Sequence, residues 1–351
     1  MKPTPATSSA PDASSRGYSP DGSFSGHGRR RACLALAALG CAPVARALPG
    51  PATAAAPPTR LARLDPDRID ATAVRDVLAH LPAPRIIALQ GSLAPVTMRP
   101  LAEFLIAMGY PRASLAHPRD DALSQSSFGS SAALAGSLAW YCEREGMVPL
   151  LIGHSQGGML AIRTLHELAG AFATEVPVWN PLTDAPEPRT TFVDPATAQD
   201  RPVLGLRVPW ACALATGKLP RLVLGQWSML TRLTKIPDTV VEFTGYAMAW
   251  DPIAGNFGNV DPYVATGTAA VKNVLLPSSY HHVALPDLAG LAEDATARTY
   301  IDGYQPGSMA PEAAPGVANL VHAADIWHSV KKHWCREAQR SAAAASRSGA
   351  A

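Results

Sequence analysis

The sequence has little excess charge, few aromatic residues and few cysteines, and each shortage excludes a class of protein. Its formal net charge is +2, and aromatic residues make up 6% of its 351 positions. A chain so balanced, with no basic stripe interleaved with aromatic residues, is not expected to bind nucleic acid. Its five cysteines and ten histidines show no zinc-ligand spacing, since His328 and His333 are five apart rather than four. We therefore expect no metal centre.

The sequence also lacks an apolar run long enough to cross a membrane. The run at 32–45 is shorter than the roughly 20 apolar residues that a spanning helix needs. Arginines at 29–31 precede it and small residues at 45–47 follow it, an order typical of an export signal and similar to a twin-arginine signal. We expect residues 1–47 to be leader and signal, and the protein to be exported, either periplasmic or secreted. A misplaced start codon and a cytoplasmic protein are the alternative.

Composition divides the rest of the chain. Residues 48–60 are rich in Pro and Ala and indicate a linker, and the small residues of 341–351 indicate a disordered tail. Between them we expect one folded domain at 61–306 and a C-terminal helical extension at 307–340. The hydrophobic share of 47% suits a chain that builds a core. No repeat of 20–50 residues is visible, which excludes a solenoid or a propeller.

Short apolar runs alternate with helical patterns inside this domain. The expected helices lie at 98–108, at 130–145 and after Ser155. The expected strands lie at 85–90, 113–116, 148–152, 175–180, 239–248 and 271–276. This alternation predicts an α/β fold with a mostly parallel sheet flanked by helices. The strands then end along one edge, where sheets of this kind place their sites.

A segment of about sixty residues, 181–238, separates two of these strands and is too long for an ordinary connection. We expect a helical cap or lid over the sheet edge, with short amphipathic helices at 204–217 and 219–235. Its apolar residues either favour a hydrophobic acyl group in the substrate or simply cover the sheet: Trp210, Leu222, Leu224, Trp227, Met229 and Leu230.

The motif Gly153-His154-Ser155-Gln156-Gly157 fits the pattern G-x-S-x-G, with an apolar run before it and a helical pattern after it. In that context the serine occupies a tight turn at the end of a strand, where glycines leave room for the neighbouring backbone. The turn exposes the hydroxyl and leaves the first N–H groups of the helix unpaired, ready to bind an oxyanion. The motif therefore predicts Ser155 as a nucleophile and the backbone N–H of Gln156 as an oxyanion donor.

A serine hydroxyl needs a base to remove its proton, and histidine is the usual one. His281 and His282 lie in a loop directly after the last expected strand. We favour His282 because an apolar turn that opens a helix follows it, and His281 stays as the alternative. His322, His328 and His333 fall at mixed positions of an amphipathic helix and are expected at the surface.

An acid should hold the histidine and should follow a strand between the serine and the histidine. Asp251 comes just after the penultimate expected strand and is favoured. Asp184, which follows the preceding strand, is its rival, and Asp261 is a weaker third option. The second oxyanion donor is expected after the first strand, where Gly91 lets the backbone N–H of Ser92 turn towards the serine.

From about residue 83 to 305 the sequence resembles the α/β-hydrolase superfamily, and Gly-His-Ser-Gln-Gly-Gly resembles the nucleophile motif of bacterial triacylglycerol lipases and esterases. The order Ser155, Asp251, His282 matches that superfamily, and the segment at 181–238 stands where its cap or lid usually lies. Gln90 departs from the His-Gly pair that the family commonly has before its oxyanion residue.

The resemblance implies hydrolysis of a small-molecule or lipid ester through an acyl-enzyme, without a cofactor. A lipase of this kind would contact a lipid interface only transiently and needs no transmembrane span. An acyltransferase or a thioesterase with the same triad is the alternative, and a non-catalytic binding protein is a third. The presence of all three triad residues argues against the binding protein.

Overall fold

The computed structural model describes residues 58–92, 95–217, 226–308 and 319–348. The chain divides into two compact units, Met1–Pro51 and Ala52–Ala351, and all described residues belong to the second. The leader and export signal expected at 1–47, and most of the expected linker, lie outside the described residues.

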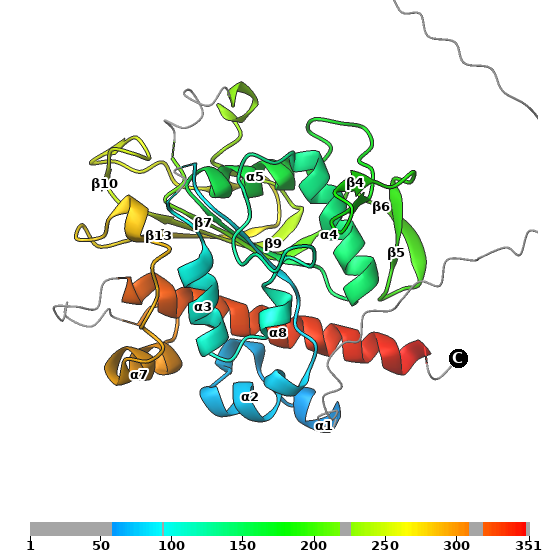
Figure 1. The fold of residues 1–351 in the computed structure, drawn as a ribbon, viewed down its shortest axis with the longest axis horizontal. Coiled ribbons are helices and arrows are strands. Elements are labelled where there is room, and N and C mark those ends of the chain that lie inside the picture. The colour runs from blue at the N-terminus through cyan, green and yellow to red at the C-terminus, as the bar shows by residue number, and fades with distance from the viewer. Residues whose placement is uncertain (1–57, 93–94, 218–225, 309–318, 349–351) are drawn as a thin grey trace, which may run out of the picture. The chain divides into compact units, whose positions relative to one another are not determined.

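A parallel sheet of five strands forms the centre of the second unit (Figure 1). Its strands, in spatial order, are β1 (Ile86–Leu89), β2 (Leu150–His154), β7 (Val208–Leu214), β9 (Val240–Ala247) and β13 (Ala270–Leu275). Every neighbouring pair in this order is parallel. β1, β2 and β7 are buried along their whole length, because the sheet is covered on both faces. The predicted α/β class with a central parallel sheet is confirmed.

Alternate side chains of the strands enter two separate cores, as the two-residue period of a strand requires. One core packs the sheet against α4 (Ser131–Glu145) and α5 (Gln156–Leu168). The other packs it against α3 (Arg99–Ala107) and the long α8 (Leu320–Ser348). Figure 1 shows these helix pairs on opposite sides of the sheet.

The remaining described helices are short: α1 (Pro58–Leu61), α2 (Ala71–Asp76), α7 (Ala295–Gly303) and the 3-10 turns η1 (Pro66–Arg68), η2 (Leu78–His80), η3 (Arg112–Ser114), η4 (Trp227–Met229) and η5 (His282–Ala284). The remaining strands form four pairs: β3 (Trp179–Asn180) with β4 (Ala185–Pro186), β5 (Thr191–Asp194) with β6 (Gln199–Pro202), β8 (Lys235–Ile236) with β12 (Val264–Ala265), and β10 (Trp250–Asp251) with β11 (Asn256–Phe257). Among the described residues, no helix is long and apolar enough to cross a membrane.

The segment at 181–238 is not the helical cap that the sequence predicts, because it supplies the middle strand of the sheet. β7 occupies the middle half of the helix expected at 204–217 and pairs with β2 on one side and β9 on the other. All its residues are buried, and a run buried on both faces has no periodicity that separates a strand from a helix. The second expected helix begins outside the described residues, and from 226 onwards the chain forms η4 and β8 instead.

Two expected strands also differ from the structure. The stretch 113–116 overlaps the 3-10 turn η3 rather than a strand. Of the strand expected at 175–180, only β3 is present, and it pairs with β4 outside the central sheet. Pro177 lies within that stretch, and a proline cannot donate to the hydrogen-bond ladder of a central strand.

Helix extends further at both ends of the domain than the composition suggests. α8 continues to Ser348, so the tail expected to be disordered at 341–351 is helical as far as the structure describes it. Alanine has the highest helix propensity, and this outweighs the low-complexity appearance of the tail. α1 begins at Pro58, inside the linker expected at 48–60.

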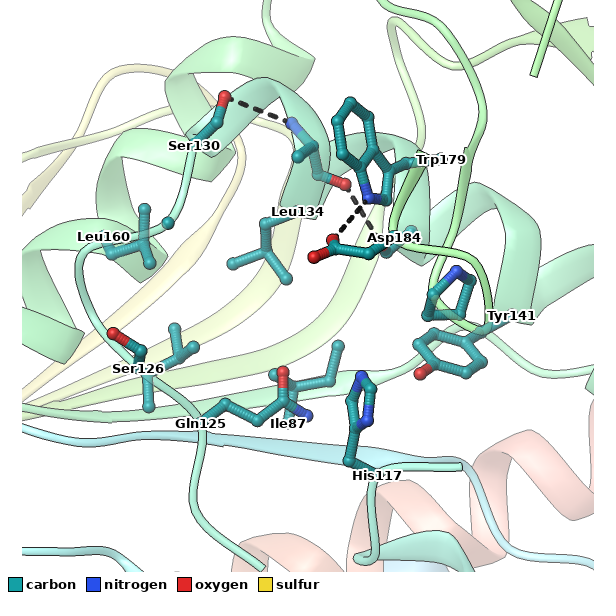
Figure 2. A pocket seen from close by; sticks show the side chains of 15 residues that line it. Ile87, His117, Gln125, Ser126, Ser130, Leu134, Tyr141, Leu160, Trp179 and Asp184 are labelled. Atoms are coloured by element: carbon teal, nitrogen blue, oxygen red, sulfur yellow. Dashed lines mark hydrogen bonds between the residues drawn. The ribbon is translucent and has the colours of Figure 1, made fainter. Parts of the chain in front are cut away.

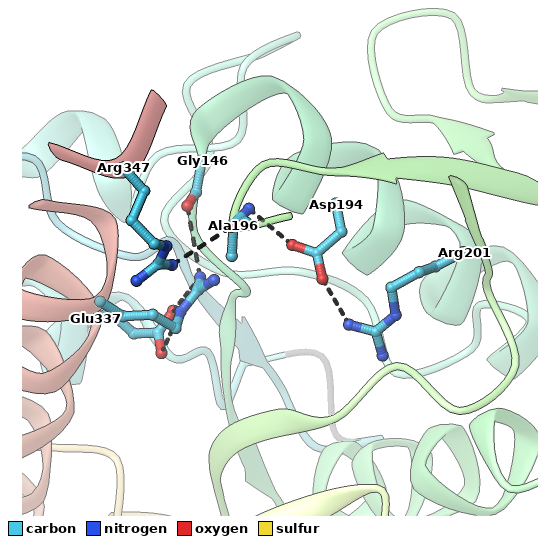
Figure 3. A network of polar contacts seen from close by, with 7 residues as sticks. Gly146, Asp194, Ala196, Arg201, Glu337 and Arg347 are labelled. Carbon is cyan, nitrogen blue, oxygen red and sulfur yellow. Dashed lines mark hydrogen bonds and ion pairs between the residues drawn. The ribbon is translucent and has the colours of Figure 1, made fainter. Parts of the chain in front are cut away.

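Polar contacts hold the last turns of α8 against neighbouring loops (Figure 3). Arg340 donates to the backbone carbonyl of Gly146 at 3.5 Å and pairs with Glu337 at 2.8 Å. Two helical turns further along α8, Arg347 donates to the backbone carbonyl of Ala196 at 3.5 Å. The expected C-terminal extension is therefore an integral part of the domain.

The three histidines of α8 are buried, and the expectation that they lie at the surface is wrong. His322, His328 and His333 are 0%, 8% and 1% exposed. The sheet covers α8 on one side, while α7 and the N-terminal helices cover others. Helical periodicity of a single segment does not reveal that more than one side is covered.

Candidate active site

Ser155 occupies a strained turn between β2 and α5. Its φ is 52° and its ψ is −117°, a backbone conformation that L-residues rarely adopt. The turn is held by a hydrogen bond from the Ser155 N–H to the carbonyl of Leu214, 2.8 Å long. A Cβ at Gly153 would lie 2.4 Å from the Gly157 carbonyl, and one at Gly157 would lie 2.1 Å from that of Leu89. The two glycines are therefore required by close backbone approach.

Ser155, His282 and Asp251 form a continuous chain of contacts. His282 Nε2 lies 3.0 Å from Ser155 Oγ, and His282 Nδ1 lies 2.8 Å from Asp251 Oδ2. The three residues are 5%, 6% and 2% exposed. Ser155 follows the carboxyl end of β2, Asp251 follows that of β9, and His282 follows that of β13. The edge of the parallel sheet therefore brings together groups that are far apart in the sequence.

The Asp251 carboxylate is fixed by a second contact. Its Oδ1 accepts the backbone N–H of Ala254 at 3.0 Å, which leaves Oδ2 to accept from His282 Nδ1. With Nδ1 donating, the Nε2 atom of a neutral ring carries the lone pair that faces Ser155 Oγ. The geometry is that of a hydroxyl, a base and an orienting acid.

The alternatives weighed from the sequence lie elsewhere. Asp184 is exposed, accepts the indole N–H of Trp179 at 3.2 Å and lies 3.3 Å from Arg119, and no contact to His282 is among those described for it. His281 and Asp261 are both exposed. The structure brings together Ser155, Asp251 and His282, and it places neither His281 nor Asp184 in this chain of contacts.

His154 contacts the loop that carries His282, a role that sequence reasoning missed. Its Nε2 lies 2.9 Å from the backbone carbonyl of His282, and the two rings are 5.0 Å apart. His154 is 1% exposed, and burial lowers its pKa to about 4, so the neutral ring donates its Nε2–H to that carbonyl. No sequence signal identifies this contact, because the acceptor is a backbone atom.

The predicted oxyanion donors lie next to Ser155. Gln156 is the first residue of α5, where backbone N–H groups have no partner within the helix. Gly91 lies against the serine, since a Cβ there would be 3.4 Å from Ser155 Cβ. Ser92 follows directly, and its role as second donor stays a prediction. The Gln90 side chain accepts the Ser124 hydroxyl at 2.8 Å, which ties this loop to a neighbouring one.

Two adjoining pockets lie along the start of α5. The smaller, about 120 Å³, is lined by Gln156 and by residues one and two turns further along the helix. It shares Gly129 and Leu160 with a larger pocket of about 240 Å³. Figure 2 shows the larger pocket between Leu160 on one side and Trp179 and Asp184 on the other. Ser155 lines neither pocket, but Gln156, the residue that follows it, lines the smaller one.

The described residues hold no group of three or more His, Cys, Asp or Glu side chains arranged to bind a metal ion. Cys142, Cys212 and Cys335 are free and buried. Burial raises the pKa of each thiol, so all three stay protonated at neutral pH.

Comparison with models of protein families, with curated proteins and with solved structures finds no match to this chain. The resemblance to the α/β-hydrolases therefore depends on the serine motif, on the chain order of the three polar residues and on the class of the sheet. The chemistry is inferred from the contacts at Ser155.

Proposed function

We propose that the protein is a serine hydrolase of the α/β-hydrolase type that cleaves carboxylic esters through an acyl-enzyme intermediate. The observation that carries this proposal is the contact chain from Asp251 through His282 to Ser155, with distances of 2.8 and 3.0 Å. A structural turn needs neither a histidine on the serine hydroxyl nor a carboxylate behind that histidine.

In the proposed reaction, Ser155 Oγ attacks the ester carbonyl while His282 Nε2 takes the hydroxyl proton. The backbone N–H of Gln156 and the loop at Ser92 stabilise the oxyanion of the tetrahedral intermediate. The intermediate collapses, the C–O bond breaks, and His282 returns the proton to the leaving alcohol. Water then attacks the acyl-enzyme by the same route and releases the acid, which restores the Ser155 hydroxyl. Asp251 stabilises the imidazolium throughout.

Exposed apolar side chains near the triad support a hydrophobic ester as substrate. Trp250 and Phe257, next to Asp251 and cross-strand partners in the β10–β11 pair, are 66% and 68% exposed. Val283, beside His282, and Phe128, on the smaller pocket, are also exposed. Such residues around a site favour contact with lipid-like molecules.

The decisive experiment is hydrolysis of p-nitrophenyl esters from acetate to palmitate by the wild type and by Ser155→Ala. We expect turnover in the wild type, loss of it in Ser155→Ala, and a covalent adduct on Ser155 when an organophosphonate is added, as read by peptide mass spectrometry. His281→Ala serves as the matched control for His282→Ala. Ester turnover that survives in Ser155→Ala contradicts the mechanism.

The same assay separates hydrolysis from acyl transfer and from thioester cleavage. An added alcohol or amine acceptor that diverts most of the acyl product would identify an acyltransferase. A higher kcat/KM for acyl thioesters than for the matched oxygen esters would identify a thioesterase. Both use the triad proposed here, and only the acceptor or the leaving group differs.

A further inference from the structure

A second group of buried polar atoms lies beyond the nucleophile on the same face of α5. Gln156 and Arg163 are seven residues apart, so both project from one side of the helix, with Leu160 between them. All three line the pocket of about 120 Å³, opposite Ser127. Ser155 does not itself line this pocket, but the next residue, Gln156, does, so the pocket adjoins the turn that carries the serine.

Three polar atoms of residues that line this pocket have no hydrogen-bond partner within the described part of the chain. They are Ser127 Oγ, Gln156 Oε1 and Arg163 Nε. Ser127 and Gln156 are 2% and 3% exposed, so bulk water has little access to hydrogen-bond with them. Buried polar atoms in native proteins are nearly always paired, and several unpaired ones around one pocket point to a ligand that pairs with them.

The charge of the pocket favours an anion. Among the described residues that line it there is no carboxylate, and Arg163 contributes a positive charge. Arg163 Nη1 donates to the neutral Gln226 Oε1 at 2.6 Å, and its guanidinium lies 5.4 Å from the ring of Phe172. These contacts hold the guanidinium, and its buried Nε–H has no partner within the described part of the chain. The Gln156 amide can present either its oxygen or its NH2 group, and the Ser127 hydroxyl can donate.

We propose that this pocket binds a carboxylate at the far end of the acyl chain, so that the preferred substrates are half-esters of dicarboxylic acids. This inference rests on the proposed ester hydrolysis. His282 must reach the leaving oxygen, which places the alcohol beside His282 and leaves the pocket along α5 to the acyl half. Met159 and Leu160 give the chain an apolar wall, and Arg163 Nε–H donates to the carboxylate at its end.

The helix geometry limits the length of the acyl chain. Eight residues separate Ser155 from Arg163, a rise of about 12 Å along α5. The arginine side chain leans back towards the start of the helix, which shortens the span to the nucleophile. An extended acyl chain of roughly six to nine carbon atoms is somewhat shorter than this rise of about 12 Å, so it fits the shortened span.

The test compares mono-p-nitrophenyl esters of dicarboxylic acids of these lengths with p-nitrophenyl alkanoates of the same chain length. We expect kcat/KM of the wild type to favour the half-ester by about 10-fold or more, since a charge-assisted hydrogen bond is formed only with the carboxylate. Arg163→Gln should bring this ratio close to one, and Arg163→Lys should keep part of it.

Arg232→Gln is the matched control. The Arg232 guanidinium also lies 5.4 Å from the Phe172 ring, but Arg232 does not line the pocket. The half-ester preference should persist in this variant. In the Ser155→Ala background, where no ester is consumed, a free dicarboxylate should raise Tm, and the added change Arg163→Gln should remove that rise.

The two proposals fail differently. Ser155-dependent hydrolysis of neutral esters without a preference for half-esters overturns the carboxylate pocket and leaves the hydrolase intact. A preference that survives Arg163→Gln, or falls equally in Arg232→Gln, also overturns the pocket. Absence of hydrolysis for every ester overturns both.

Discussion

Two aspartates of this protein are buried almost equally, yet their surroundings differ in one respect. Asp251 is 2% exposed and Asp325 is 1% exposed. Asp325 lies on α8 and accepts from Tyr246 at 2.7 Å, from Tyr304 at 2.9 Å and from Lys272 at 2.5 Å. Every one of these partners donates to the carboxylate, so the network around Asp325 is closed.

The contacts of Asp251 instead continue outwards. Its histidine partner presents a second ring nitrogen to Ser155, whose hydroxyl lies at the edge of the sheet. At the other network, burial and the Asp325 charge raise the pKa of Tyr246 well above its usual range, so the phenol stays a donor. Burial and hydrogen bonding are therefore common to Asp251 and Asp325. What separates the candidate site from the structural network is a chain of contacts that ends on a serine hydroxyl in a strained turn.

The comparison predicts that Asp251 acts on the reaction rate. Asp251→Asn should lower kcat by about 10⁴-fold, because the amide favours the wrong histidine tautomer and does not stabilise the imidazolium. The measurement is kcat with a p-nitrophenyl ester, and Asp184→Asn is the matched control with turnover near the wild type. An inactive Asp184 variant beside an active Asp251 variant would reverse the assignment.

Asp325 should act on stability. Asp325→Ala removes the acceptor of a lysine and two phenols, and we expect the free energy of unfolding to fall by about 2–5 kcal/mol, chiefly because the two buried phenols lose their acceptor. Chemical denaturation measures this change, and kcat of the folded fraction should stay within about twofold of the wild type, since no triad residue contacts Asp325 in the described structure. Tyr304→Phe, which removes one donor, should cost only about 1 kcal/mol. A loss of kcat without a loss of stability would erase the distinction between the two aspartates.

A change at His154 tests how far the proposed catalytic network extends. His154→Ala removes the donor to the His282 carbonyl. We expect kcat to fall about 10- to 100-fold, the loss typical when a hydrogen bond that orients a functional histidine is removed. His154→Gln should recover part of the loss, because its amide N–H can reach the same carbonyl. His166→Gln is the control, since His166 also donates to backbone carbonyls but on the far end of α5. Equal losses in both variants would mean that only packing is involved.

Each network also borders a buried neutral histidine, which predicts a shared response to acid. Burial lowers the pKa of His154 and of His322 to about 4, against about 6.5 in the unfolded chain. Between these values the unfolded chain binds more protons, so stability is highest above pH 6.5 and falls as the pH drops towards 4. Each group contributes at most about 1.4 kcal/mol per pH unit.

Denaturation midpoints between pH 4.5 and 7.5 measure this dependence. His322→Asn should make the decline with falling pH shallower, provided that stability at pH 7.5 is used as the reference for each variant. An unchanged slope in His322→Asn would show that this histidine is not kept neutral by the fold.

The sequence was sufficient to predict the parts of the site that obey local rules. The serine motif fixes a strand, a turn and a helix, and parallel strands deliver their ends to one edge, so Asp251 and His282 could be selected by their place after strands. β7 could not be predicted, because a run buried on both faces has no period. The burial of α8 was missed because it depends on elements distant in the chain.

The same limit applies to contacts between side chains and backbone. His154 donates to a carbonyl 128 residues away, and no residue type marks such an acceptor. The pocket at Arg163 was likewise invisible, because the loop at Ser127 that faces α5 comes from another part of the chain. Such contacts follow from the packing of elements, which a single sequence does not specify.

The contact between α8 and the N-terminal helices has a consequence for how fast the domain forms. Gln339 on α8 donates to the backbone carbonyls of Leu61 and Leu64, residues 278 and 275 positions earlier, at 3.0 Å each. Closing so large a loop has a high entropic cost, and chains rich in distant contacts fold slowly. We therefore expect the core between α3 and α8 to form late in refolding, with its tryptophans Trp327 and Trp334, which are 1% and 0% exposed in the folded protein, becoming buried at that step. A slow fluorescence phase that is lost when Trp327 and Trp334 are replaced by phenylalanine would support this order, and an unchanged slow phase would contradict it.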